Sequence, residues 1–343
     1  MSDSPDSNPS RGTPAGAMRL MLAPMEGLAD EVLRDVLTAL AHYDQAVTEF
    51  VRVSSTAVSP RSFLRISPEL RNQGRTRAGT PVQVQLLGAD PALMAASAAR
   101  VLPLSPAGID LNFGCPAPTV NRHRGGAVLL DEPETLHAVA AAVRDAMPPG
   151  SPPLSAKMRL GVADKRRAIE CAQALADAGV ERLVVHARTK LEGYRPPAHW
   201  SWVGRIAEAV ALPVVANGEV WTVDDWRRCR GESGVADVMI GRGAVADPFL
   251  ARDIRLDRSH DPHDPREADW QTLVPAIAYF WQRVCAKVEA RHAPGRLKQW
   301  LAMLGRRFSQ AQALFDHLRP LKSVAQIDAA LVQAGVCRLA RAA

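Results

Sequence analysis

Short apolar runs alternate along the chain with longer stretches whose apolar positions recur at helical spacing. Eight runs have the character of strands, and each ends in Gly, Asn, Pro or a polar cluster. They occupy residues 20–24, 45–50, 81–87, 108–113, 154–160, 182–188, 212–217 and 235–241. Stretches of helical pattern lie between them, as at 91–101, 133–146, 166–178 and 222–230. Because strand and helix alternate eight times, the pattern predicts an α/β fold, a (β/α)8 TIM barrel, and favours it over a doubly wound open sheet.

The pattern changes after residue 255. A polar stretch that contains proline follows, and from residue 270 onward the spacing is helical with hardly a strand signal. We therefore expect a barrel over 18–255, a linker over 256–269 and a small all-α domain of three to five helices over 270–343. The first residues are rich in Ser, Pro, Gly and Asp, which cannot bury a core, so 1–17 is expected to be a disordered tail.

The composition favours a globular protein of a reducing compartment. Hydrophobic residues make up 47% and charged residues 23% of the chain, and no apolar run approaches the roughly 20 residues that span a bilayer. The N-terminus lacks the features of a signal peptide. Five widely spaced cysteines without a C-x-x-C pair predict neither disulfides nor a metal site, and we expect a cytoplasmic location. Four of them are expected to be buried structural thiols: Cys171, Cys229, Cys285 and Cys337.

Positive charge is concentrated at the C-terminal end. Residues 270–343 hold 11 Lys and Arg against 3 Asp and Glu, whereas residues 1–269 hold 31 against 33. A basic cap on a nearly neutral body is typical of a protein that binds a polyanion. Only six of the 42 basic residues are Lys, so the abundance of Arg by itself also fits a compositional bias. The asymmetry between the two parts is the stronger signal.

Polar residues gather where the predicted strands end, which is the edge of a TIM barrel that carries the active site. The fourth run ends in NFGCP, which supplies Asn112 and Cys115. The third run carries Gln85, the fifth Lys157 and the sixth His186. A lone histidine is more often a core residue, and a lysine can extend from a strand to the rim. Together on neighbouring strands, these residues indicate a polar barrel mouth for an anionic or electron-rich ligand.

Glycine-containing turns follow the last two runs, NGE at 217–219 and GRG at 241–243. Glycine lets the backbone approach closely, so that N–H groups can hold phosphate oxygens, and Arg242 adds positive charge. Each turn alone is equally compatible with an ordinary glycine turn. Because the loops after the seventh and eighth strands are the common phosphate position of this fold, the two together predict a phosphorylated cofactor.

Seven segments, in their order and spacing, resemble the motifs of the tRNA-dihydrouridine synthases. They are LAPMEG, VQLLG, DLNFGCPAPTV, KMRLG, VVHARTKLEGY, VVANGEV and VMIGRGA, and they extend from about residue 22 to residue 249. The segments TEFVRV, RLKQWL and LFDHLR resemble the bacterial C subfamily, which acts on uridine-16 in the D-loop of tRNA. The resemblance implies a flavin-dependent oxidoreductase that reduces a tRNA uridine to 5,6-dihydrouridine.

The resemblance also implies roles for individual residues. Cys115 would be the catalytic acid, and Asn112 would hydrogen-bond the flipped uracil. FMN would contact Ala23, Pro24, Met25, Gln85, Lys157, His186, Asn217, Gly218, Glu219, Gly241 and Arg242. The tRNA would contact Arg52, Tyr194, Arg296, Lys298 and Arg319. NADPH would reduce the FMN, and we expect a monomer that binds neither a metal nor a membrane.

The implied reaction gives the thiol of Cys115 a purpose. The C5=C6 bond of uracil is conjugated with the C4 carbonyl, so hydride adds at C6 and the resulting enolate needs a proton at C5 from the opposite face. A free thiol has a pKa of roughly 8.5, so it is mostly protonated near neutrality and can still donate a proton. A base inside folded tRNA must also flip out to reach such a pocket, which suits the basic cap.

Two departures from the family pattern and two alternative functions complete the prediction. Phe113 stands where the family usually has a smaller or unbranched residue, and Pro118 stands where a basic residue is common, with Arg122 and Arg124 nearby. The first alternative is a flavin barrel oxidoreductase for free pyrimidines, which would not need a basic helical cap. The second is a non-catalytic tRNA-binding protein, which would not need the full set of polar residues at the barrel mouth.

Overall fold

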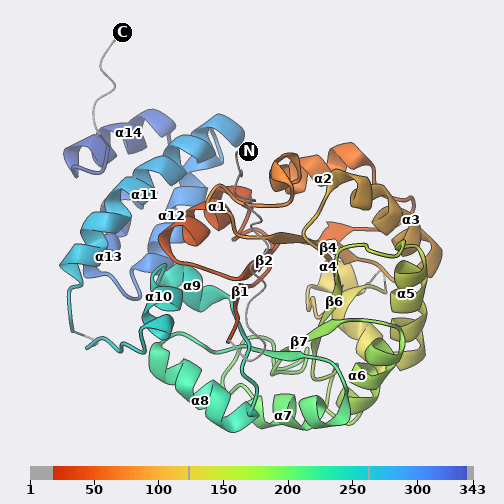
Figure 1. The fold of residues 1–343 in the computed structure, drawn as a ribbon. Helices are drawn as coiled ribbons and strands as arrows, with labels where there is room; N and C mark the ends of the chain where they lie inside the picture. Colours follow the sequence, from red (N-terminus) through yellow and green to blue (C-terminus); the bar gives the residue numbers. More distant parts are fainter. Residues whose placement is uncertain (1–17, 123, 262, 338–343) are drawn as a thin grey trace, which may run out of the picture.

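The structure, a computed structural model, describes residues 18–122, 124–261 and 263–337. The predicted tail over 1–17 lies outside the described residues. Within them, parallel strands close into a barrel, helices surround it, and the C-terminal helices lie together on one side of the barrel (Figure 1).

The barrel has eight strand positions that follow the eight predicted apolar runs. The strands are β1 (Leu20–Leu22), β2 (Gln45–Val47), β3 (Val51–Arg52), β4 (Val82–Leu87), β5 (Ile109–Phe113), β6 (Leu154–Arg159), β7 (Arg182–His186), β8 (Val214–Asn217) and β9 (Val238–Ile240). Neighbouring strands are parallel, and the pairing of β2 with β4 closes the ring. The short β3 continues the second position and also pairs with β4. The predicted TIM barrel is confirmed.

Helices with local start signals cover the outside of the barrel. Asp90 caps α3, because its Oδ1 accepts a hydrogen bond from the backbone N–H of Leu93 at 2.9 Å. At the start of α8, Thr222 and Asp225 form a reciprocal capping box. The helices are α1 (Glu31–Leu40), α2 (Pro60–Ile66), α3 (Pro91–Val101), α4 (Pro118–Asn121), α5 (Pro133–Asp145), α6 (Ala168–Asp177), α7 (Trp200–Ala209), α8 (Val223–Ser233), α9 (Arg242–Ala246) and α10 (Leu250–Arg255).

Side chains that point into the barrel divide its interior into an apolar half and a polar half. The apolar half is a small buried cluster from β1, β2, β7, β8 and β9: Met21, Ala23, Val47, Val184, Val215 and Met239. On β4, β5 and β6 the interior positions are polar and alternate with apolar ones, as the period of two in a strand requires. These polar positions are Gln83, Gln85, Asp110, Asn112, Ser155 and Lys157. The intervening apolar residues pack under the helices as part of the main core.

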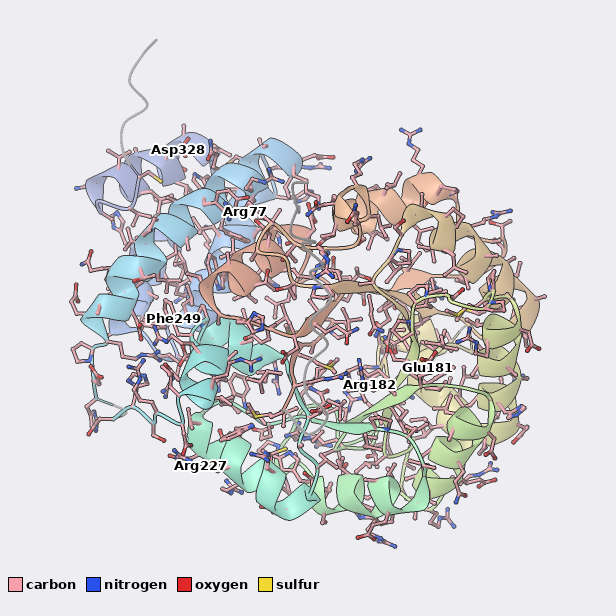
Figure 2. All side chains as sticks on the ribbon, in the orientation of Figure 1. Arg77, Glu181, Arg182, Arg227, Phe249 and Asp328 are labelled. Carbon is pink, nitrogen blue, oxygen red and sulfur yellow. The ribbon has the colours of Figure 1, made fainter. Side chains whose placement is uncertain are left out.

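Four helices lie beside the barrel in the described part of the C-terminal region. They are α11 (Glu267–Lys287), α12 (Ala293–Leu304), α13 (Ser309–Leu318) and α14 (Val324–Gln333). The indole N–H of Trp300 donates to the carbonyl of Val245 in α9 at 3.3 Å, and the rings of Phe249 and Phe308 meet edge to face at 6.4 Å. Figure 2 shows Phe249 where these helices adjoin the barrel. The domain boundaries at 255 and 270 stay a prediction.

The cysteines agree only in part with the sequence-based prediction. All five are free, and Cys171 and Cys229 are buried as predicted. The prediction is wrong for Cys285 and Cys337, which are only half-buried. Cys285 lies on α11 and Cys337 lies beyond the end of α14, in the small helical region, where few neighbours cover a side chain. No helix among the described residues is both long enough and apolar enough to span a membrane.

A buried arginine joins the end of the barrel to the first C-terminal helix. The side chain of Arg266 is 2% exposed, and its guanidinium pairs with Asp253 at 3.0 Å, with Asp269 at 2.7 Å and with Asp247. His260 lies 2.9 Å from the same Asp253 carboxylate. The ligand atoms of Asp253, His260 and Asp269 fall within 4.8 Å of one another, but the two carboxylates already pair with Arg266 and Arg252. This cluster therefore acts as an ionic joint.

Replacing this arginine tests the joint. We expect Arg266→Met to lower the free energy of unfolding in urea by about 3–5 kcal/mol, because it removes the buried cation that the three carboxylates share. The matched control is Arg227→Met. Arg227, on α8 (Figure 2), pairs with Asp257 at 2.8 Å and is 40% exposed, so its loss should cost less than about 1 kcal/mol. Equal effects of the two substitutions would contradict a buried joint.

Candidate active site at the barrel mouth

One cavity opens at the carboxyl ends of the strands. Its volume is about 490 Å³, within the range of small-molecule and cofactor sites. Every residue predicted to contact FMN lines it, as do the predicted acid Cys115 and the predicted substrate contacts Asn112 and Tyr194. The fold thus brings together residues from eight strand ends that are separated by more than half of the chain.

Four sequence-predicted tRNA contacts lie outside the cavity lining: Arg52, Arg296, Lys298 and Arg319. Arg296, on α12, forms an ion pair with Asp30 at 2.9 Å and so ties the helical region to the loop after β1. The ammonium of Lys298 donates to the backbone carbonyl of Arg319 at 3.0 Å. Arg52 donates to the backbone carbonyl of Thr119, within α4, at 3.2 Å. Of the four, Arg52 and Arg319 have exposed side chains, and Arg319 lies at the end of α13.

The loop that carries Cys115 is anchored from two sides. The side-chain oxygen of Asn112 accepts hydrogen bonds from the backbone N–H groups of Gly114 at 3.0 Å and Cys115 at 2.9 Å. From the next strand, Arg159 Nε donates to the carbonyl of Gly114 at 2.8 Å. Burial, together with the nearby Glu26 carboxylate, raises the pKa of the half-buried Cys115 thiol. The thiol is therefore protonated at neutral pH.

Two bases in the cavity are shifted toward their neutral forms. Burial and the neighbouring Arg159 lower the pKa of Lys157 from 10.5 to about 8. Burial and the surrounding cations hold the pKa of His186 well below its usual value of 6.5. At neutral pH, then, Lys157 is still charged and His186 is a neutral imidazole that can both donate and accept a hydrogen bond.

The far end of the cavity presents a cation and a glycine turn. The Arg242 guanidinium lies 4.8 Å from the ring centre of Tyr194 and 5.0 Å from that of Trp221, and in the described part of the chain it forms no ion pair. Gly218 has a φ of +113°, and a Cβ there would lie 2.8 Å from the ring of His186. Only glycine allows the turn to approach this closely. The arrangement suits an anionic group.

Sequence reasoning gave no role to several buried residues of the site. Arg159 and Arg188 are 1% and 0% exposed, and Arg188 pairs with the carboxylate of Glu219. Asp110 is 1% exposed in the middle of β5. The available signal was the recurrence of charged residues two positions apart within apolar strands, since such residues share the interior face. Trp221 carried no such signal, because its position depends on the fold of the loop after β8.

The two departures from the family pattern have simple structural outcomes. Phe113 is fully buried at the end of β5, so its extra volume is accommodated in the main core. Pro118 starts the short helix α4, where a missing backbone N–H costs nothing. Arg124 is exposed and forms an ion pair with Glu132 at 2.6 Å.

The profile of the dihydrouridine synthase (Dus) family matches residues 21–332, nearly the whole chain. The chain belongs to the dihydrouridine synthase family. Relatives at high identity agree: the tRNA-dihydrouridine(16) synthase of Aquipseudomonas alcaligenes is 54% identical over 91% of this chain and 98% of its own length. That of Shewanella oneidensis is 43% identical over 92% of this chain and 98% of its own length. The sequence-based prediction of the family, and of an enzyme, is confirmed.

Solved structures with similar folds are more distant in sequence. Histamine dehydrogenase from Rhizobium sp. 4-9 superimposes with a TM-score of 0.54 at 14% identity, over 77% of this chain and 48% of that protein. A 2-naphthoyl-CoA reductase in complex with 2-naphthoyl-CoA gives a TM-score of 0.53 at 12% identity, over 70% of this chain and 50% of that protein. These likenesses concern the fold.

The lowered pKa of Lys157 predicts that this residue destabilises the flavin-free protein. We expect Lys157→Met to raise the free energy of unfolding at pH 7 by about 1–3 kcal/mol, because folding disfavours the charged amine. The gain should shrink between pH 8 and pH 10.5, where the folded wild type has released the proton that its unfolded state still binds. Urea titrations across this range measure it.

The exposed Lys322 offers the control. Lys322→Met should change the free energy of unfolding by less than about 0.5 kcal/mol at every pH. If Lys157→Met leaves the free energy of unfolding at pH 7 unchanged or lowers it, the charged Lys157 does not destabilise the folded state.

Proposed function

We propose that this chain reduces a uridine in tRNA to 5,6-dihydrouridine, at position 16 of the D-loop, with FMN as cofactor and NADPH as reductant. The observation that carries the proposal is the cavity itself, whose lining includes a protonated thiol, a charged lysine and an arginine that forms no ion pair among the described residues. Family membership and relatives named for position 16 support the reaction and the site of modification. We also propose that residues 270–343 form the tRNA-binding domain.

The residues of the cavity fit FMN. Arg242 and the backbone of the turns at 217–219 and 241–243 would hold the phosphate. The carboxylate of Glu219 is occupied by Arg188, so Glu219 would contribute through its backbone. The loop after β1 and the side chains of the polar half of the barrel would border the ring: Ala23, Pro24, Met25, Gln85, Lys157 and His186. When bound, the flavin supplies hydride to C6 of the uracil.

The chain itself supplies the proton and the orientation. Cys115 keeps its proton at neutral pH because burial raises the pKa of the thiol, and the anchored loop directs the thiol into the cavity. Asn112 lies beside it and would hydrogen-bond the uracil. Below pH 8 the charged Lys157 attracts an anionic ligand, and the neutral His186 adds hydrogen bonds without adding charge. Together these residues would hold the base with C5 facing the thiol.

A uridine can enter such a cavity only after it leaves the stacked RNA. Tyr194 lies at the rim with 54% of its surface exposed, so its ring is accessible to a base. The helical region beside the rim carries most of the excess positive charge, including Arg296, Lys298 and Arg319. We propose that this region holds the phosphate backbone of the tRNA while Tyr194 and Arg52 contact the nucleotides near the cavity.

Removing the thiol tests the acid. We expect Cys115→Ala to lower kcat by about 10²- to 10⁴-fold with little change in FMN content, because only the proton donor is lost. In cells that lack the gene, wild type should restore dihydrouridine at position 16 and Cys115→Ala should not. Cys285→Ala, which removes a half-buried thiol of the helical region, should behave as wild type. Loss of a different D-loop position would contradict position 16, and loss of none would contradict the function.

Salt dependence tests the helical region. The affinity for unmodified tRNA should fall with salt, and Arg319→Ala should reduce the slope of log K against log salt by about 1, because one phosphate contact is lost. Arg228→Ala is the control, since this exposed arginine lies on α8. A slope that is the same for Arg319→Ala and wild type would exclude Arg319 from the tRNA contact.

A further inference from the structure

A continuous line of hydrogen bonds runs from the middle of the barrel to the loop of Cys115. Gln85 Nε2 donates to Asp110 Oδ2 at 2.7 Å, and Asn112 Nδ2 donates to Gln85 Oε1 at 2.7 Å. Asn112 Oδ1 in turn accepts from the backbone N–H of Cys115 at 2.9 Å. Asp110 and Gln85 are 1% and 0% exposed, so water cannot replace these partners.

The Cys115 N–H at one end and the Asp110 carboxyl group at the other determine how the two side-chain amides between them are oriented. A backbone N–H can only donate, so the amide of Asn112 must turn its oxygen toward Cys115 and its nitrogen toward Gln85. The amide of Gln85 must then turn its oxygen toward Asn112 and its nitrogen toward Asp110. The line is satisfied throughout only if the group at position 110 accepts a hydrogen bond. A carboxylate at that position meets this condition.

The remaining contacts of Asp110 leave this direction unchanged. Its other oxygen, Oδ1, lies 2.5 Å from the hydroxyl of Ser155, and that hydroxyl is also 3.1 Å from Gln83 Oε1. A proton between Asp110 and Ser155 can belong to either one, while Oδ2 accepts from Gln85 in both cases. Among the described residues no basic side chain forms an ion pair with Asp110. The cost of its burial is met by these hydrogen bonds and by the positive charge of the nearby Lys157 and Arg182.

We propose that Asp110 is a positioning residue that holds the loop of Cys115 by setting the direction of the Gln85 and Asn112 amides. The proposal rests on the proposed role of Cys115 for its functional meaning, but the hydrogen-bond line can be tested without RNA or flavin. A hydrogen-bond acceptor at position 110 thus allows Asn112 to turn its oxygen toward the loop of Cys115.

The test exchanges the residue types at positions 110 and 112. Asp110→Asn keeps an oxygen toward Gln85 and can donate to Ser155, so the line should survive. Asn112→Asp places a carboxylate oxygen opposite Gln85 Oε1, so that two acceptors face each other. Rotating the Gln85 amide by half a turn would bring Oε1 against the Asp110 carboxylate instead, so two acceptors would still face each other. In the double variant D110N/N112D, Asn at position 110 donates to the turned Gln85, which donates to the Asp at position 112. Every group is then satisfied again, with the wild-type net charge.

The first readout is the alkylation rate of the Cys115 thiolate by iodoacetamide, followed on its own peptide by mass spectrometry and taken from the high-pH plateau, where the effect of a new carboxylate on the thiol pKa no longer enters. The second is the melting temperature of the flavin-free protein. Asn112→Asp should raise the alkylation rate by about fivefold or more and lower the melting temperature. Asp110→Asn and the double variant should stay within about twofold of wild type. If Asn112→Asp alone does not fold, recovery of a folded double variant still supports the proposal.

A double variant that remains unfolded, or that is as reactive as Asn112→Asp, would overturn the proposal, as would an unchanged alkylation rate in Asn112→Asp. These outcomes are independent of the proposed function. If the exchange behaves as expected but Cys115→Ala still forms dihydrouridine, the line of hydrogen bonds is real and the role of the thiol is wrong.

Discussion

Hydrogen bonding inside a barrel that excludes water is the constraint on which the site depends. β4, β5 and β6 turn amides, a carboxyl, a hydroxyl and an amine into the interior, where each polar group needs a partner. The partners are found mostly among neighbouring strands, so the parallel register determines which groups meet. Asn112, for example, lies opposite Lys157 across the pair of β5 and β6. A polar interior of this kind fixes side-chain directions more strictly than an apolar core of equal volume could.

The cavity above this interior contains charged groups that favour the binding of a ligand and destabilise the protein without one. Lys157 and Arg242 lie in a partly buried space and form no ion pair within the described part of the chain, and the pKa of each is lowered by burial. Arg188, by contrast, forms an ion pair with Glu219 and is part of the cavity wall. Arg188 therefore has a structural role, whereas Lys157 and Arg242 are available to bind an anionic ligand. Stacking on Tyr194 and Trp221 holds the Arg242 guanidinium in place while leaving its N–H groups available.

Local patterns in the sequence were enough to predict the barrel and most of the cavity. Each strand has its own apolar run, and closing the ring necessarily brings the polar residues at the strand ends together. Contacts between distant segments were not predictable in this way. The burial of Arg266, the engagement of Arg296 with the loop after β1 and the position of Trp221 all depend on how separate elements pack. Nor does an amphipathic pattern reveal how well a small helical region covers Cys285 and Cys337.

The ionic joint around Arg266 affects whether the barrel can fold without the C-terminal helices. Asp247 belongs to the barrel and is 3% exposed, yet both of its cations, Arg266 and Arg307, come from beyond residue 255. A chain that ended with the barrel would bury this carboxylate without a counter-charge. We therefore expect the barrel and the helices to unfold as one cooperative unit, although the sequence divides them clearly. In evolution, the helical cap can be exchanged only for another that supplies a cation at the same place.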